Sequence, residues 1–248
     1  MTWGFLTVTH IVSLIFAVAM IVGLYFILKG RTERTKTIVL GILSFSGLAA
    51  IIYNLLVWNS PLEYLPFHLC SLSAMVLPFA VFTKNKVLNN LLLLWSFGSL
   101  FALLINVSVA EASIFSWVFF FFYFPHVLEC GIPILMFALK MTKKDLKCIG
   151  STLGITLGAY TVVHFINLFV NDYAIKHNVL DWKSEVISVN YMYSIRPENP
   201  LLDLFSSIIP HSYWYMYLTM IMAAVYLGLV YLPEIIALVR KKRGGPTA

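Results

Sequence analysis

The sequence predicts an all-α membrane protein built as a bundle of seven transmembrane helices. Of its 248 residues, 60% are hydrophobic and only 11% are charged, whereas soluble domains carry about 25% charged residues. Apolar runs of about 20 residues are long enough to cross a bilayer. Seven such runs lie at residues 5–28, 37–58, 64–83, 88–108, 112–139, 148–170 and 205–239. We therefore expect a single transmembrane helical domain at residues 1–243, and we take residues 244–248 as an appended tail.

The distribution of basic residues predicts the orientation of this bundle. Lys and Arg accumulate in the cytosolic connections of membrane proteins. Most of the 17 Lys and Arg residues lie in every second connection and in the tail, at residues 29–36, 84–86, 140–147 and 240–243. The intervening connections hold only Lys176, Lys183 and Arg196. We therefore expect an external N-terminus, a cytosolic C-terminus, and contact between the basic connections and anionic lipid headgroups.

Charge and cysteine usage argue against several other classes of protein. The net charge is +6, but no basic patch is interleaved with exposed aromatic residues, so we expect no nucleic-acid partner. The three cysteines, Cys70, Cys130 and Cys148, lie in or beside apolar runs, and an odd number argues against a disulfide framework. The histidines and cysteines show no metal-ligand spacing such as H-x-x-E-H or C-x-x-C. We expect neither a metal nor a cofactor.

Polar side chains deep in the apolar runs are the candidate functional residues, because such groups are costly in hydrocarbon. At about 1.5 Å of rise per residue, Cys70 and His126 each lie about 21 Å from a flanking cytosolic lysine. The other deep polar side chains fall mainly in the outer half of the membrane, and they are His10, Asn54, His68, Asn106, His164 and Asn167. Together they predict a polar cavity that opens outward or toward the outer leaflet. For each one alone, a hydrogen bond between helices is the simpler interpretation.

A thiol and an imidazole at matching depth are a candidate nucleophile and general base. Buried thiols are ordinarily small apolar groups, and we assign that role to Cys130 and Cys148. Cysteine chemistry requires the thiolate, so Cys70 needs a base within hydrogen-bond reach, and His126 is the candidate. Glu129 lies one turn from His126 on the same helix face. We expect this buried acid to pair with His126, as the third member of a triad, or with another helix.

Residues 171–204 form the longest polar connection, on the predicted outer face. The segment contains Trp182, Tyr191 and Tyr193, residue types that favour the membrane interface. A long ordered loop in a compact membrane protein is often a lid or a binding element. We interpret this segment as a lid over the cavity, with a flexible linker as the equally favoured alternative.

Three segments resemble the YwaF-like family of integral membrane proteins, which includes the vertebrate transmembrane protein 164. They are Leu65-Pro66-Phe67-His68-Leu69-Cys70, Phe124-Pro125-His126, and Asn190-Tyr191-Met192-Tyr193 followed by Leu201-Leu202-Asp203. The resemblance covers most of the chain, from residue 35 to residue 235. Residues 208–212 depart from the Gly-Pro-Trp-Pro-like stretch that bacterial members carry before the last helix. The vertebrate relative is described as a phospholipid acyltransferase that uses a cysteine and a histidine, which match Cys70 and His126 by position.

The resemblance implies an intramembrane lipid acyltransferase or lipid-ester hydrolase that forms an acyl-thioester on Cys70. A membrane phospholipid or lysophospholipid would be its partner. From their depth we take Asn106, His68 and His164 as candidate donors to the oxyanion of the reaction. The alternative is a non-enzymatic transporter, lipid-binding or sensory protein that uses the same cavity. We expect a multi-pass protein of a bacterial plasma membrane.

Overall fold

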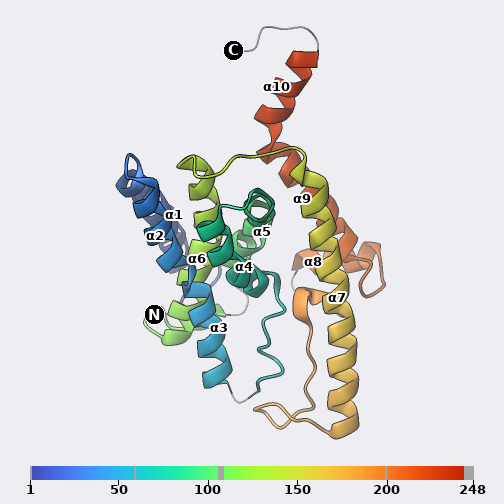
Figure 1. Ribbon diagram of the computed structural model, residues 1–248. Coiled ribbons are helices and arrows are strands. Elements are labelled where there is room, and N and C mark those ends of the chain that lie inside the picture. Colours follow the sequence, from blue (N-terminus) through green and yellow to red (C-terminus); the bar gives the residue numbers. More distant parts are fainter. Residues whose placement is uncertain (1, 59, 106–108, 199, 243–248) are drawn as a thin grey trace.

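The chain folds into an all-α bundle, which confirms the predicted class (Figure 1). The computed structural model describes residues 2–58, 60–105, 109–198 and 200–242. Within these ranges the helices are α1 (Val8–Leu28), α2 (Glu33–Ser44), α3 (Ser46–Val57), α4 (Leu69–Thr83), α5 (Lys86–Ile105), α6 (Trp117–Ala138), α7 (Cys148–His177), η2 (Tyr191–Tyr193), α8 (Pro200–Ile208), α9 (Met216–Val230) and α10 (Leu232–Lys242). The described residues contain no β-strand beyond two isolated bridges.

Five stretches of helix in the described residues are long and apolar enough to cross a membrane. They are α1, α2 together with α3, α5, α6 and α7. Helices α9 and α10 meet at a bend of 64° and make a sixth crossing if they are counted as one. Helix α4 is apolar but has only 15 residues. The chain is therefore a multi-pass membrane protein, and its described residues contain five or six candidate helical spans of full length, where the sequence predicted seven.

Prolines explain where the helices depart from the predicted runs. The run expected at 64–83 becomes helical only at Leu69, because Pro61 and Pro66 lack a backbone N–H and disfavour helix in the residue before each. The run expected at 205–239 is divided among three helices. Helix α8 ends before Pro210, and the bend between α9 and α10 precedes Pro233.

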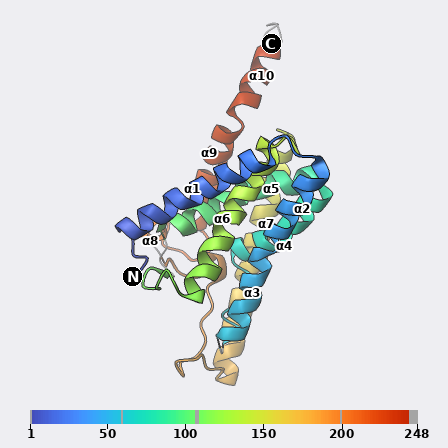
Figure 2. The same cartoon turned by 90° about the vertical axis from the view of Figure 1, so that its left-hand side faces the viewer.

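Helices α4, α5 and α6 form the centre of the bundle, and the other helices surround them (Figure 2). The main hydrophobic core joins the run Leu91–Leu94 of α5 to Leu77 of α4 and to Leu128 and Ile132 of α6. Helix α1 packs on α6 from outside and is mostly exposed, as expected for a helix that faces lipid. The central helices therefore keep their polar side chains away from hydrocarbon.

The basic connections that follow α1, α4 and α6 lie together at one end of the bundle, beside the start of α10. Three ion pairs join them, namely Lys84 with Glu33, Lys86 with Asp145, and Lys144 with Glu234. The hydrogen bond from Lys86 holds the pKa of the Asp145 carboxyl below its usual value. These pairs connect the segments that follow α1, α4 and α6 with α10, so connections far apart in the sequence share one face.

The opposite end carries the segment at residues 178–198, which is folded onto the bundle (Figure 1). Helix α7 has 30 residues, so the non-helical part begins at residue 178 and not at 171 as predicted. Asn171 and Val189 exchange two hydrogen bonds, of 3.0 and 2.7 Å. Asn167 and Tyr191 do the same at 2.8 and 2.9 Å. These paired contacts fix the backbone of the segment along α7, which argues against a flexible linker.

The buried side chain of Asn90 joins three segments at the end of the bundle that carries the basic connections. Its side chain is fully buried in α5. The amide nitrogen donates to the carbonyl oxygens of Lys86, at 2.7 Å, and Lys143, at 3.2 Å. The amide oxygen accepts from the Asp145 N–H, at 3.3 Å, and from the Tyr231 hydroxyl. One side chain therefore ties α5 to the connection after α6 and to the end of α9.

The substitution Asn90→Ala is expected to lower the free energy of unfolding by about 1–3 kcal/mol, because it leaves buried polar groups without partners. Thermal unfolding in detergent micelles measures the change. Ser151→Ala is the control, since that hydroxyl bonds only to the Cys148 carbonyl in its own helix. A midpoint for Asn90→Ala equal to that of the unaltered protein would contradict the role given to Asn90.

Candidate active site

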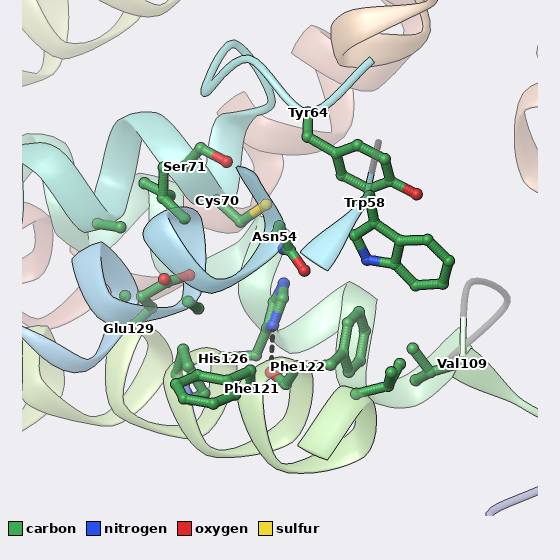
Figure 3. A pocket seen from close by; sticks show the side chains of 16 residues that line it. Asn54, Trp58, Tyr64, Cys70, Ser71, Val109, Phe121, Phe122, His126 and Glu129 are labelled. Atoms are coloured by element: carbon green, nitrogen blue, oxygen red, sulfur yellow. Dashed lines mark hydrogen bonds between the residues drawn. The ribbon is translucent and has the colours of Figure 1, made fainter. Parts of the chain in front are cut away.

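A cavity of about 220 Å³ lies where α3, α4 and α6 meet. Its polar lining consists of Asn54, Cys70, Ser71, His126 and Glu129. Figure 3 shows Cys70 and Asn54 on one side of the cavity, with the His126 ring pointing toward them from the other. Helices from separate parts of the sequence therefore bring the thiol and the imidazole to one cavity.

Small residues on α3 allow the three helices to approach closely. Gly47, Ala50 and Asn54 recur at i, i+3 and i+7, and all three line the cavity. A Cβ atom on Gly47 would lie 2.5 Å from the Cβ of Ala74 in α4 and 2.7 Å from Oε1 of Glu129 in α6. Helix α3 therefore touches both neighbours at Gly47. Sequence analysis did not single out this glycine, although its spacing from Asn54 was visible.

Cys70 is the second residue of α4, at the end of the helix that favours negative charge. The first backbone N–H groups of a helix have no acceptor within it, and the side chain of the N-cap residue, His68, does not cap them. These N–H groups and the helix dipole favour a thiolate and so oppose the cost of burying its charge. The thiol itself is half-buried and faces the cavity. The late start of α4 therefore gives Cys70 a position typical of reactive cysteines.

The hydrogen bonding of His126 leaves one ring nitrogen ready to act as a base. Its Nδ1 atom lies 2.6 Å from the carbonyl oxygen of Phe122. A carbonyl oxygen only accepts, so Nδ1 carries the hydrogen, and Nε2 of the neutral ring has a free lone pair. Figure 3 shows that this second nitrogen points toward Asn54 and Cys70. No hydrogen bond joins Cys70 to His126 in the described structure, and catalytic pairs often tighten only around substrate.

Glu129 is held by another helix and not by His126. The Ser99 hydroxyl of α5 donates to Oε2 of Glu129 at 3.1 Å, and the carboxyl group is almost completely buried. Among the described hydrogen bonds, the partner of His126 is the Phe122 carbonyl. Of the two partners expected for Glu129, the structure therefore favours the one on another helix. The His126 ring is oriented by the backbone carbonyl of Phe122.

Aromatic side chains surround the mouth of the cavity. Trp58 and Tyr64 both line it, and their rings stack at 5.7 Å between centroids. Trp182 of the segment at 178–198 reaches this point, with its ring centroid 6.1 Å from that of Trp58. Trp182 is thus the contact between the predicted lid segment and the cavity mouth.

His164 and Asn167, both predicted to line the cavity, instead bind the segment at residues 178–198. The Oγ atom of Ser194 lies 3.0 Å from Nδ1 of His164 and 2.9 Å from Nδ2 of Asn167. Asn167 is completely buried by these contacts and by its bonds to Tyr191. Neither side chain lines the cavity, because both face the folded segment along α7. His164 is therefore removed from the expected oxyanion donors.

His68 also faces away from Cys70, as the spacing of two residues requires. Its Nδ1 accepts a hydrogen bond of 3.4 Å from the Met192 N–H, and its ring packs against Tyr191 and Tyr193. It lines a separate polar pocket of about 200 Å³. His68 is thus not placed to stabilise an oxyanion at Cys70.

His10 and Asn106 complete the predicted set. Nδ1 of His10 accepts from the Leu6 N–H at 3.0 Å, so Nε2 donates to the Leu103 carbonyl at 2.9 Å. Its ring lies edge-on to Trp3, and it is completely buried. This histidine therefore packs the N-terminus onto α5, outside the cavity. Asn106 lies outside the described residues.

The fold and the site define a class: a multi-pass helical membrane protein whose central cavity contains a cysteine and a histidine. The model of the TMEM164 family matches residues 5–231. The chain belongs to the TMEM164 family, which confirms the resemblance carried by the three sequence segments. Comparison with curated proteins gave no match, and comparison with solved structures gave none either.

The substitution Gly47→Ala is expected to destabilise the fold by about 1–3 kcal/mol, because the added methyl group overlaps two neighbouring helices. Gly158→Ala in α7 is the matched control, since nothing lies within 4 Å of its Cβ position. Alanine is also the better helix former, by about 1 kcal/mol. Thermal unfolding in micelles compares the two variants. A Gly47→Ala protein as stable as Gly158→Ala would refute the close packing at α3.

Proposed function

We propose that this chain is an intramembrane enzyme of lipid ester metabolism, either a lipid acyltransferase or a lipid-ester hydrolase. The observation that carries the proposal is the convergence of Cys70 and His126 on one cavity, with Nδ1 of His126 bound to the Phe122 carbonyl and Nε2 turned inward. A thiol at a helix N-terminus opposite a free imidazole nitrogen is the arrangement that nucleophilic catalysis requires. The family match supplies the membrane setting but not the reaction.

The proposed reaction has two steps on Cys70. Nε2 of His126 takes the thiol proton as the sulfur attacks the carbonyl carbon of a lipid ester. The tetrahedral intermediate collapses, the carbon–oxygen bond breaks, and the leaving alcohol receives the proton from Nε2. In the second step His126 deprotonates a lysolipid hydroxyl or a water molecule, which attacks the thioester. The sulfur then leaves and regains the proton, so the enzyme returns to its starting state.

The shape of the cavity supports a lipid substrate. Its aromatic walls and the stacked Trp58 and Tyr64 give an apolar surface around a few polar groups, which is typical of small-molecule sites. We infer that the cavity holds the reacting ester of a phospholipid or lysophospholipid, while the rest of the acyl chain stays in the bilayer.

We also propose seven crossings, an external N-terminus and a cytosolic C-terminus, in the plasma membrane of a bacterium. Helix α4 would span about 22 Å of a hydrocarbon core about 30 Å thick. The non-helical residues 61–68 would complete this crossing, and non-helical backbone is tolerated at membrane depth where it lines a cavity, as Tyr64 does. The joined basic segments would then face cytosolic anionic headgroups.

A second candidate is a transporter, sensor or lipid-binding protein without catalysis. The observation that favours it is the absence of a hydrogen bond between Cys70 and His126 among the described residues. In that case the thiol would be inert, and Cys70→Ala would leave ligand binding unchanged.

The acyl-enzyme is tested by incubating the purified protein in nanodiscs with phospholipid and measuring a hydroxylamine-sensitive acyl adduct by intact mass. Cys70→Ser is expected to abolish the thioester, because no thiolate remains. His126→Ala is expected to slow its formation about 100-fold or more, as for loss of a general base. Cys130→Ser and His177→Ala are controls outside the cavity. Turnover retained in both Cys70→Ser and His126→Ala would exclude the proposed mechanism and leave the binding alternative.

Orientation is tested with single cysteines in a protein whose own three cysteines are replaced by serine. Lys143→Cys lies at the basic end, and Lys183→Cys lies in the outer segment. With a membrane-impermeant maleimide on intact cells, we expect labelling at position 183 and protection at position 143. The reverse pattern would invert the proposed topology, and labelling at both would disprove the assignment of opposite faces.

A further inference from the structure

Asn54 has an unused side-chain amide inside the cavity. It lies on the cavity face of α3, and its backbone carbonyl accepts from the Trp58 N–H at 3.1 Å. Its side chain makes no hydrogen bond among the described residues, whereas Asn89, Asn90, Asn167 and Asn171 all do. A carboxamide offers two N–H donors, and the half-buried side chain of Asn54 presents them to the cavity. The cavity therefore contains a donor group whose partner is not another protein group.

The position of this amide relates it to Cys70 and His126. Figure 3 shows Asn54 beside the Cys70 sulfur and facing the His126 ring. The three residues come from α3, α4 and α6, so each helix supplies one polar group to the same space. An acyl group attached to the Cys70 sulfur would place its carbonyl oxygen within this space.

Orientation of the imidazole is excluded as the role of Asn54. In some cysteine enzymes an asparagine or an acid fixes the histidine through Nδ1. Here Nδ1 of His126 is already bound to the Phe122 carbonyl at 2.6 Å. The role left for an inward-facing amide is to contact the substrate.

We propose that the side-chain amide of Asn54 is the oxyanion donor of this site. The inference rests on the acyl-enzyme chemistry proposed for Cys70. As the sulfur attacks, the electron pair of the carbonyl bond moves onto oxygen, and an Nδ2–H of Asn54 donates a hydrogen bond to that negative charge. When the intermediate collapses the pair returns to carbon and the leaving group departs, so Asn54 gains and loses no proton.

The start of α4 supplies a second donor to the same oxygen. The N–H groups of Cys70 and Ser71 belong to the first turn of α4, where no acceptor within the helix is available. A backbone N–H of the nucleophile together with a side-chain amide is a donor pair suited to a tetrahedral oxyanion. Both tetrahedral intermediates, in thioester formation and in its breakdown, would use this pair.

The test measures single-turnover formation of the acyl adduct on Cys70 with phospholipid in nanodiscs. Asn54→Ala and Asn54→Asp are expected to lower the maximal rate of acylation about 100- to 1,000-fold, because the lost bond forms mainly in the transition state. The phospholipid concentration that gives half of the maximal rate is expected to change little. Breakdown of the isolated thioester is expected to slow by a similar factor. Leu56→Ala is the control, since this residue of α3 is 80% exposed.

A second readout separates this role from a structural one. Alkylation of Cys70 by iodoacetamide needs the thiolate but no oxyanion donor, so its rate is expected to be unchanged in Asn54→Ala. A parallel fall in alkylation would overturn the proposal by showing that Asn54 positions the thiol or the fold. Normal acylation by Asn54→Ala would overturn it while leaving the acyl-enzyme mechanism in place. Absence of any adduct on the unaltered protein would refute the mechanism and this inference together.

Discussion

In hydrocarbon every polar group must find its partner inside the protein, and this constraint organises the structure. At the end of the bundle that carries the basic connections, the buried Asn90 side chain finds its partners in α5, in the connection after α6 and at the end of α9. At the other end, Asn167 and Asn171 find their partners in the segment at residues 178–198. His10 meets this constraint with both ring nitrogens. Against this background the Asn54 amide and Nε2 of His126 stand out, because both groups retain free hydrogen-bonding capacity and both face the same cavity.

Prolines and the segment at residues 178–198 together position the N-terminal end of α4. Prolines keep residues 61–68 out of the helix, so α4 starts next to Cys70 instead of one or two turns earlier. The segment at residues 178–198 then holds this non-helical stretch by two hydrogen bonds. The Met192 N–H donates to His68, and the Tyr191 hydroxyl donates to the Leu62 carbonyl. Residues far from the cavity therefore set the position of the thiol.

The side chains along one face of α3 produce close packing at one end of the cavity and open space at the other. Gly47 brings α3 against Ala74 and Glu129, and the larger Asn54 further along the same face borders the open volume. Glu129 of α6 is buried between Gly47 of α3 and Ser99 of α5. The site is thus formed by the packing of α3, α4 and α6 against one another.

The sequence by itself determined the membrane class, the basic end, the family and the matching depths of Cys70 and His126, because hydropathy, charge and helical rise are properties of each segment alone. It could not determine that α4 begins at residue 69, that α7 continues to 177, or that His68, His164 and Asn167 leave the cavity. It left two partners open for Glu129, His126 or another helix, and the packing of α5 against α6 decided for Ser99. Which neighbour a helix face meets depends on how all the helices pack around one another, and only the tertiary structure decided that.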